Sequence, residues 1–394
     1  MPVSRRTFVR SLMNGAAAPS SLAARGHEAW VGEHGLDGDQ AAAAVPASDA
    51  TRLNSNENPL GPSRAALQAI EGAFAYAGRY PMNAKPAMAD FRTAVAKQHG
   101  LKMENVRLGA GSGEILDGAV RAFTSTSRGL VAGLPTFEAP VRRARALNAP
   151  VVEVPVDAAG RLDLEKMIAG CGGAGLMFVC NPNNPTGAVQ PSAAIADLVT
   201  RIRKASPDTV ILIDEAYHEY VTDPSYATAV PLVTQHPNVI VSRTLSKLHG
   251  MAGLRLGYAI GDAKTLERLA PWMMPYNANA PAVAAAVVSI QDEAQIERER
   301  ARNTEALKFT TEFFRSAGLK TTDSQANFVW VDLTQPSKAF REGCQKQGIL
   351  VGRDFPPFEK THCRVSIGTM DEMKRAVGVF RSVLGLTTSS VSRG

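Results

Sequence analysis

Short, uninterrupted apolar runs recur along this chain and constrain its fold more than any other feature. They read LVAG at residues 130–133, VVEVPV at 151–156, LMFVC at 176–180, VILID at 210–214, VIVS at 239–242 and GYAIG at 257–261. Continuous runs, rather than alternating ones, indicate strands that are buried on both faces. Helical patterns lie between them, for example at 164–168 and 193–205. The sequence therefore predicts an α/β fold with a doubly wound, mostly parallel sheet, whose ligands bind at the carboxyl ends of the strands.

The chain has 394 residues, which is long enough for two domains. We expect a large domain over residues 76–290. After Pro281 a charged helix is expected over about 291–314, and the remaining strand and helix patterns predict a small α/β domain. The proline-rich segment 51–75 is expected to pack with residues 291–388 in that small domain.

Composition excludes several classes of partner. Basic residues are scattered, the net charge is only +6, and no aromatic-interleaved basic stripe is present, so we expect no nucleic-acid surface. No apolar run approaches the length of a membrane span. The four cysteines show neither metal-ligand spacing nor a disulfide framework, and we predict that they are structural and that there is no metal site: Cys171, Cys180, Cys344 and Cys363.

The first fifty residues have a different character. The segment SRRTFVR at residues 4–10 resembles a twin-arginine export signal, and a weakly apolar segment and an Ala/Gly/Ser-rich tract follow it. We interpret residues 1–50 as a leader with a low-complexity linker and predict a periplasmic location. The alternative is a basic N-terminus without a targeting role, in which case the protein is cytoplasmic.

Polar motifs follow three of the predicted strands, at 181–187, 214–217 and 242–247. Because parallel strands end at one edge of a sheet, these motifs should gather there. Lys247 comes just after an apolar run, between hydroxyl residues (Thr244, Ser246) and Arg255. A buried amine suits a lysine that forms an imine with an aldehyde cofactor, while hydroxyls and a guanidinium hold a phosphate. The alternative for an isolated lysine is a solvated side chain at a helix start.

A second phosphate-binding pattern lies earlier in the chain. Gly109, Gly111 and Gly113 connect a predicted strand at 106–108 to a helix expected over 114–123. Glycines leave backbone N–H groups uncovered, and a helix N-terminus adds partial positive charge. The pattern therefore predicts a phosphate cradle, although a purely structural turn would have the same sequence.

Taken together, NENPLGPS, GRYP, NPNNPTG, DEAYHEY, SRTLSKLHGMAGLR and HCRVSIGT resemble the fold-type I aminotransferases that depend on pyridoxal 5'-phosphate (PLP). Within that superfamily the sequence is most similar to histidinol-phosphate aminotransferases, from about Leu53 to the C-terminus. The resemblance implies an enzyme that takes an amino group from an amino acid or amino-alcohol phosphate and transfers it to a 2-oxo acid such as 2-oxoglutarate.

The resemblance also implies roles for individual residues. Lys247 would bind the cofactor aldehyde and move the proton, and Asp214 would keep the pyridine nitrogen protonated. Asn184 and Tyr217 would hydrogen-bond the ring hydroxyl, and Phe137 would stack on the ring. The phosphate would be held by Ser112, Gly113, Thr244, Ser246 and Arg255, whose fork of donors a lysine lacks.

Three further positions match family residues around the substrate. Tyr80 would reach the phosphate of a neighbouring subunit, which implies a homodimer with shared sites. Arg364, assisted by Arg353, would bind the acidic group of the substrate. The alternatives for these positions are structural: a helix-cap Asp, a turn Asn, a core Tyr217 and Phe137, a Tyr80 at the end of a surface helix, and solvated arginines.

The predicted leader leaves the substrate open. Histidine biosynthesis belongs in the cytoplasm, so an exported enzyme would use another donor, such as an aromatic amino acid. Other PLP reactions on this scaffold are decarboxylation, β-elimination and an O2-using oxidation. A PLP-binding regulator is disfavoured because the region before Arg52 lacks a helix-turn-helix pattern, and a binding protein with a dead site is disfavoured by Asp214, Lys247 and Arg255.

Overall fold

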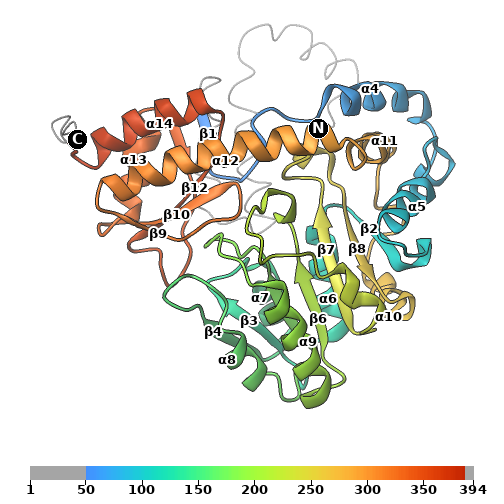
Figure 1. Cartoon of the computed structure of the whole chain (residues 1–394). Helices are drawn as coiled ribbons and strands as arrows, with labels where there is room; N and C mark the ends of the chain where they lie inside the picture. The colour runs from blue at the N-terminus through green and yellow to red at the C-terminus, as the bar shows by residue number, and fades with distance from the viewer. Residues whose placement is uncertain (1–49, 387–394) are drawn as a thin grey trace, which may run out of the picture. The chain divides into compact units, whose positions relative to one another are not determined.

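The computed structural model describes residues 50–386, so the predicted leader lies outside the described residues. Its largest element is a seven-stranded sheet (Figure 1). The strand order is β2 (Val106–Gly109), β8 (Gly257–Gly261), β7 (Val239–Thr244), β6 (Val210–Asp214), β5 (Leu176–Cys180), β3 (Leu130–Leu134) and β4 (Val151–Pro155). The strands from β7 to β4 pair in parallel, and only β8 runs antiparallel to its neighbours. The predicted mostly parallel α/β sheet is confirmed.

Helices cover both faces of this sheet. One face packs against α4 (Arg64–Ala73), α5 (Met88–Gln98), α8 (Leu164–Ala169), α9 (Ser192–Ala205) and α11 (Ala280–Ser289). The other face packs against α6 (Ser112–Phe123), α7 (Ala139–Ala146) and α10 (Ala263–Leu269). Successive residues of a strand point to opposite faces, so Ile211 and Ile213 enter the first core and Val210 and Leu212 the second. This two-sided burial explains the uninterrupted apolar runs.

The run VVEVPV is the exception to two-sided burial. It forms β4, whose pattern of exposure is mixed, and 43% of Val152 is exposed. The expectation that this run is buried on both faces is wrong, because β4 is the outermost strand of the sheet and has a neighbour on one side only. An apolar run of this length does not distinguish a central strand from an edge strand.

The C-terminal third forms a smaller sheet, which packs with helices around its own hydrophobic core. Its antiparallel sheet has the order β12 (His362–Ser366), β10 (Phe328–Asp332), β9 (Lys320–Thr321). This part also contains α12 (Glu293–Ser316), α13 (Ser337–Lys346) and α14 (Met370–Val383).

The start of the described chain returns to this C-terminal part. Strand β1 (Thr51–Leu53) pairs in parallel with β11 (Ile349–Val351), and Figure 1 shows β1 beside the C-terminal elements. Helix α4, in contrast, packs against α11. The segment between β1 and α4 therefore connects the C-terminal part to the helices that cover the large sheet.

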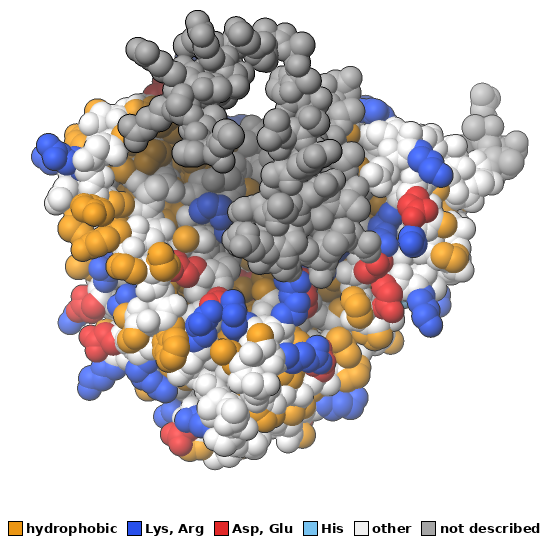
Figure 2. Space-filling model, turned by 180° about the vertical axis from the view of Figure 1, so that it is seen from behind, with side chains coloured by type: hydrophobic (Ala, Val, Ile, Leu, Met, Phe, Trp, Pro, Cys, Tyr) orange, Lys and Arg blue, Asp and Glu red, His pale blue; other side chains and the backbone are white. Residues whose placement is uncertain are grey.

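Residues 50–386 were predicted to contain no membrane span, no metal site and no disulfide. In this range no helix is long and apolar enough to cross a membrane, and no group of three or more His, Cys, Asp or Glu residues is arranged to hold a metal ion. The four cysteines are buried and unbonded. On the face drawn in Figure 2, basic side chains are interspersed with acidic and apolar ones.

Candidate active site

The polar motifs do meet at one edge of the large sheet. Strands β5, β6 and β7 are parallel neighbours, with Cys180 paired to Asp214 and Asp214 paired to Ser242. The loop that carries Asn184 follows β5, and the turn that carries Lys247 follows β7. The candidate site is therefore built on strand ends, as the sequence predicted.

Asp214 is a buried carboxylate with an unsatisfied atom. Its side chain is 3% exposed, and Oδ1 has no hydrogen-bond partner among the described residues. Burial raises the pKa of Asp214 to about 7 and the nearby charge of Glu215 acts in the same direction, whereas the Ser242 hydroxyl and the charge of Lys247 oppose this rise. A buried acceptor of this kind is costly unless a donor or a cation reaches it. The protonated nitrogen of a pyridine ring is a group that would satisfy it.

Lys247 lies half-buried beside Tyr217. Its Nζ donates to Ser55 O at 3.1 Å and stands 5.8 Å from the centre of the Tyr217 ring. Burial lowers the pKa of Lys247 to about 8, helped by the positive charge of Arg364, while Asp214 acts in the opposite direction. The uncharged amine, which is the form that attacks a carbonyl carbon, is therefore much more abundant near neutral pH than it is for an exposed lysine.

The Tyr217 hydroxyl group connects Asn56, which lies before α4, with Asn184, which lies in the loop after β5. This oxygen accepts hydrogen bonds from Asn56 Nδ2 at 3.0 Å and from Asn184 Nδ2 at 3.4 Å. The ring packs edge-on against Phe328 of β10, with centroids 5.1 Å apart. Asn184 and Tyr217 therefore lie together, as predicted.

Arg364 enters the same network from β12. Its Nη1 donates to Asn184 Oδ1 at 2.8 Å and its Nη2 to Asn54 O at 2.7 Å, while Nε has no partner among the described residues. The side chain is 5% exposed, and burial lowers its pKa to about 10. A buried guanidinium with an open N–H and no carboxylate bonded to it is suited to an acidic ligand.

Arg353 lies next to Arg364 but is already paired. Both guanidinium groups stand over the ring of Phe355, at 4.4 Å for Arg353 and 4.9 Å for Arg364. Arg353 Nη2 also bonds Glu138 Oε1 at 2.5 Å. The structure therefore places Arg353 beside the predicted substrate arginine, with its own charge neutralised by Glu138.

The phosphate cradle is predicted at the turn before α6. Gly111 has φ +78° and is the N-cap, so α6 begins at Ser112, two residues earlier than expected. A Cβ on Gly111 would collide with Arg255 Nη2 and lie 2.9 Å from its Cζ. The first N–H groups of a helix, here those of Ser112 and Gly113, have no partner within the helix. Glycine thus lets an arginine lie against a turn of free donors, which is a suitable site for a phosphate.

The hydroxyl groups predicted for the cradle lie at the end of β7 and in the turn that follows it. Thr244 and Ser246 are both buried, and Ser246 N donates to Thr244 Oγ1 at 3.1 Å. Gly257 of β8 pairs with Thr244, and a Cβ on Gly257 would collide with Ser112 N. The missing side chain at Gly257 therefore allows β7, β8 and the α6 N-terminus to approach one another closely.

The two remaining aromatic predictions have different outcomes. Phe137 is half-buried and its backbone lies beside Cys180, the last residue of β5, so it stands near the other strand ends. Tyr80 is 67% exposed, and its ring packs on Tyr276 with centroids 5.1 Å apart. The single chain does not bring Tyr80 to the Lys247 group, and its role toward a neighbouring subunit stays a prediction.

Sequence reasoning missed the contribution of residues 54–56. In this segment Asn54 O, Ser55 O and Asn56 Nδ2 contact Arg364, Lys247 and Tyr217, respectively. Asn56 itself has φ +54° and is fixed by Ser366 and Asn327. The only signal was the motif NENPLGPS, which marked the region as family-like but gave no residue a role.

Comparisons with known proteins agree with this geometry. The class I and II aminotransferase family matches residues 48–380. The chain is 35% identical over 339 residues to the histidinol-phosphate aminotransferase of Symbiobacterium thermophilum, covering 86% of this chain and 91% of that protein. It is 34% identical over 339 residues to the protein of the same name from Moorella thermoacetica, covering 85% and 86%.

A solved structure has the same fold. It is the histidinol-phosphate aminotransferase of Sinorhizobium meliloti in complex with pyridoxal-5'-phosphate, which aligns with a TM-score of 0.78 at 24% identity over 95% of this chain and 96% of that one. Because the family matches residues 48–380 and these relatives are 34–35% identical over most of its length, the chain belongs to the class I and II aminotransferases.

Proposed function

We propose that this protein is a PLP-dependent aminotransferase that moves an amino group from a donor to a 2-oxo acid, with 2-oxoglutarate as the expected acceptor. PLP supplies an aldehyde that receives the amino group and a ring that accepts electrons from the substrate. One observation carries the proposal: the unsatisfied, buried carboxylate of Asp214 lies at the strand end next to the turn of Lys247.

Each polar residue has a distinct task in this proposal. Asp214 binds and orients the ring nitrogen, and its negative charge keeps that nitrogen protonated. Lys247 holds the cofactor through Nζ and later carries a proton to or from the substrate, for which a pKa of about 8 is suitable. Asn184 and Tyr217 bind the ring hydroxyl. Phe137 packs on the ring face.

The phosphate of the cofactor is assigned to the cradle before α6. The backbone N–H groups of Ser112 and Gly113 bind its oxygens, and the guanidinium of Arg255 neutralises its charge. The hydroxyl groups of Thr244 and Ser246 complete the donor set. This combination anchors one end of the cofactor, while Asp214 fixes the other.

Arg364 is assigned to the acidic group of the substrate, which is a carboxylate or a phosphate. Its free Nε and its position beside Lys247 and Tyr217 support this role. Histidinol phosphate is the first donor to test, because the two relatives named above are histidinol-phosphate aminotransferases. The twin-arginine-like segment SRRTFVR favours a second candidate, an exported enzyme that uses an aromatic or other amino acid.

We also propose a homodimer in which Tyr80 reaches the phosphate of the partner subunit. Four large side chains within residues 80–276 support an interface, since they are unusually exposed for apolar residues: Tyr80 (67%), Trp272 (49%), Met274 (71%) and Tyr276 (53%). Size-exclusion chromatography with light scattering tests the dimer, and cell fractionation tests the periplasmic location.

The function is tested with Lys247→Ala. This variant should lose turnover and the visible absorbance of the lysine-bound cofactor, whereas Lys264→Ala, which changes an exposed lysine of α10, should keep both. Normal turnover in Lys247→Ala would refute the proposal. Turnover without any 2-oxo acid would indicate a decarboxylase, lyase or oxidase instead. A screen of amino donors, histidinol phosphate included, that follows cofactor absorbance in single half-reactions then identifies the substrate.

A further inference from the structure

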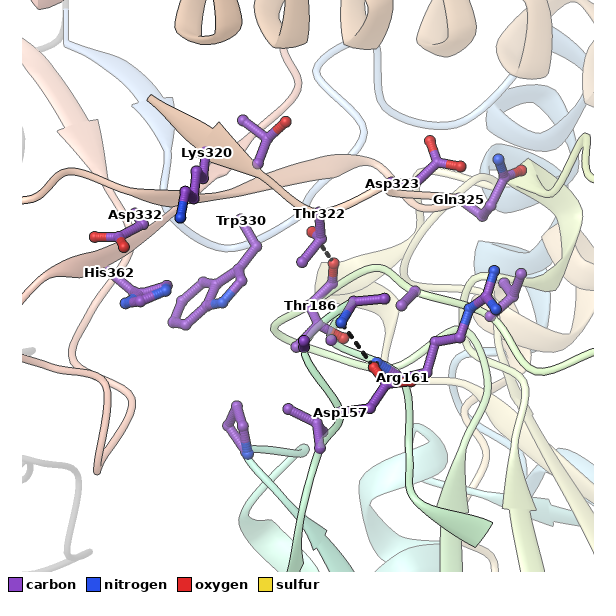
Figure 3. A pocket seen from close by; sticks show the side chains of 18 of the residues that line it. Asp157, Arg161, Thr186, Lys320, Thr322, Asp323, Gln325, Trp330, Asp332 and His362 are labelled. Carbon is purple, nitrogen blue, oxygen red and sulfur yellow. Dashed lines mark hydrogen bonds between the residues drawn. The ribbon is translucent and has the colours of Figure 1, made fainter. Parts of the chain in front are cut away.

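A cavity of about 530 Å³ lies outside the candidate active site. One wall comes from the segment after β4 and from the turn at Thr186, and the other comes from β9, β10 and β12 (Figure 3). Thr322 Oγ1 donates to Thr186 O between the two walls. The volume falls in the range of pockets that bind small molecules.

The charged side chains at one end of this cavity form a matched set. Lys320 of β9 and His362 of β12 both stand opposite Asp332 of β10, so the three share one face of the small sheet. Lys320 makes no ion pair within residues 50–386. Asp332 uses Oδ1 to accept from Thr334 N, which leaves its second oxygen directed elsewhere. A cation and an anion on neighbouring strands can bind the carboxylate and the ammonium of one small zwitterion.

The surface next to this pair is apolar and aromatic. Trp330 stacks on His362 with centroids 5.2 Å apart and is 4% exposed, and Phe358 packs edge-on against both rings. Figure 3 shows Trp330 and His362 lying side by side, next to Lys320 and Asp332. Val156 and Val189 line the opposite wall. An apolar side chain would therefore find a matching surface beside the charged pair.

We propose that this cavity is a second binding site, which takes a free α-amino acid with an apolar or aromatic side chain. Lys320 binds the carboxylate of the ligand and Asp332 binds its ammonium group. The side chain of the ligand packs along Trp330 and Phe358. The mixed charge of the pair selects a zwitterion over a simple anion or amine.

The cavity is separate from the candidate active site but adjoins it. Trp330 stands opposite Arg364 in the β10–β12 pair, and both contact Phe355, which is 3% exposed. Trp330 and Phe355 thus form a wall between the ligand and Arg364. A ligand that presses on Trp330 should change the affinity of Arg364 for its acidic substrate, an effect that rests on the function proposed above for Arg364.

Binding is measured by calorimetry on PLP-loaded protein in which the bond between Lys247 and the cofactor has been reduced with borohydride, so that the cofactor neither turns over nor captures the amine of a probe. The probe is L-phenylalanine, compared with phenylethylamine, which lacks the carboxylate, and 3-phenylpropanoate, which lacks the ammonium group. We expect L-phenylalanine to bind at least tenfold more tightly than either analogue. Equal affinity of the three probes would overturn the proposal. No detectable binding of L-phenylalanine at about 10 mM would do the same, because weaker binding would not define a specific site.

Variants then locate the site. Lys320→Met and Asp332→Asn should each weaken binding of L-phenylalanine at least tenfold. Asn at position 332 retains the acceptor for Thr334 N, so the turn is kept. Lys346→Met changes an exposed lysine at the end of α13 and is the matched control. Unchanged affinity in both cavity variants would place the ligand elsewhere and refute the assignment.

The effect on the active site is a separate measurement. In the wild-type enzyme the ligand should change KM for the acidic substrate by at least threefold, and Lys320→Met should abolish that change. Binding without a change in KM would leave the cavity assignment standing and refute the contact through Trp330. Failure of the aminotransferase assay would concern the proposed function only, because the binding measurements need no turnover.

Discussion

Replacing Asp214 with Asn tests whether the buried carboxylate destabilises the protein until a cation binds next to it. In the folded protein its pKa is about 7, against an ordinary value of 3.8. The folded state therefore keeps a proton that the unfolded chain releases, and stability is lost as pH rises from about 4 to about 7. A shift of this size corresponds to a full penalty of about 4 kcal/mol above pH 7. Asn at position 214 stays neutral, so the Asp214→Asn variant avoids this penalty.

The assay is urea unfolding of cofactor-free protein at pH 5 and pH 8. Proton linkage for these two pKa values makes wild type lose about 2.5 kcal/mol relative to Asp214→Asn between the two conditions. Other titrating groups are common to both proteins and cancel in the difference. Asp208→Asn, which changes an exposed carboxylate, should show no such trend.

The cofactor should reverse this order. A protonated ring nitrogen gives the Asp214 carboxylate the positive partner that it lacks in the cofactor-free protein. The PLP-loaded wild type should therefore be more stable than PLP-loaded Asp214→Asn at pH 8. A stability difference between the cofactor-free proteins that does not depend on pH would refute the reasoning, because it would mean that the carboxylate finds another partner when the protein folds.

Three further substitutions test other parts of the site. Arg255→Lys keeps a charge but loses the fork of donors, so the affinity for PLP, measured by equilibrium dialysis, should fall about tenfold; unchanged affinity would remove Arg255 from the cradle. Arg364→Ala should raise KM for the acidic substrate at least tenfold while PLP stays bound, and an unchanged KM would end its assigned role. Tyr217→Phe removes the acceptor of two hydrogen bonds and should lower stability by about 1–3 kcal/mol in thermal unfolding, with PLP still bound; an unaltered Tm would show that Asn56 and Asn184 find other partners.

Much of the fold and of the site was predictable because both depend on local patterns. Two-sided burial makes the central strands continuously apolar, and the parallel order brings the residues after β5, β6 and β7 to one edge. The motifs that carry Asp214, Asn184 and Lys247 are therefore found at the ends of apolar runs, whereas the roles of these residues come from the family resemblance. The edge position of β4 was not predictable, because it depends on which strands lie beside it, and run composition does not report that.

Contacts between distant segments were beyond the reach of sequence patterns. Ser55 O bonds a lysine 192 residues away, and Asn56 N bonds Ser366, 310 residues away. Neither contact produces a periodic or compositional pattern in the sequence, because on the side of residues 55 and 56 each is made by a main-chain atom. Gly257 is similar: its need for glycine arises from Ser112 N on another element. Such constraints become visible only when the strands are in register.

The shifted pKa values show that burial destabilises both charges of the site. Burial moves the pKa of Asp214 up to about 7 and that of Lys247 down to about 8, so each group is easier to neutralise than it is in water. A structural ion pair would shift the two pKa values in the opposite directions, because each charge would stabilise the other. Here Lys247 Nζ donates to Ser55 O, and Asp214 Oδ1 has no hydrogen-bond partner among the described residues. A ligand with a positive end toward Asp214 and an electrophilic carbon toward Lys247 suits both groups at once, which supports the cofactor orientation proposed above.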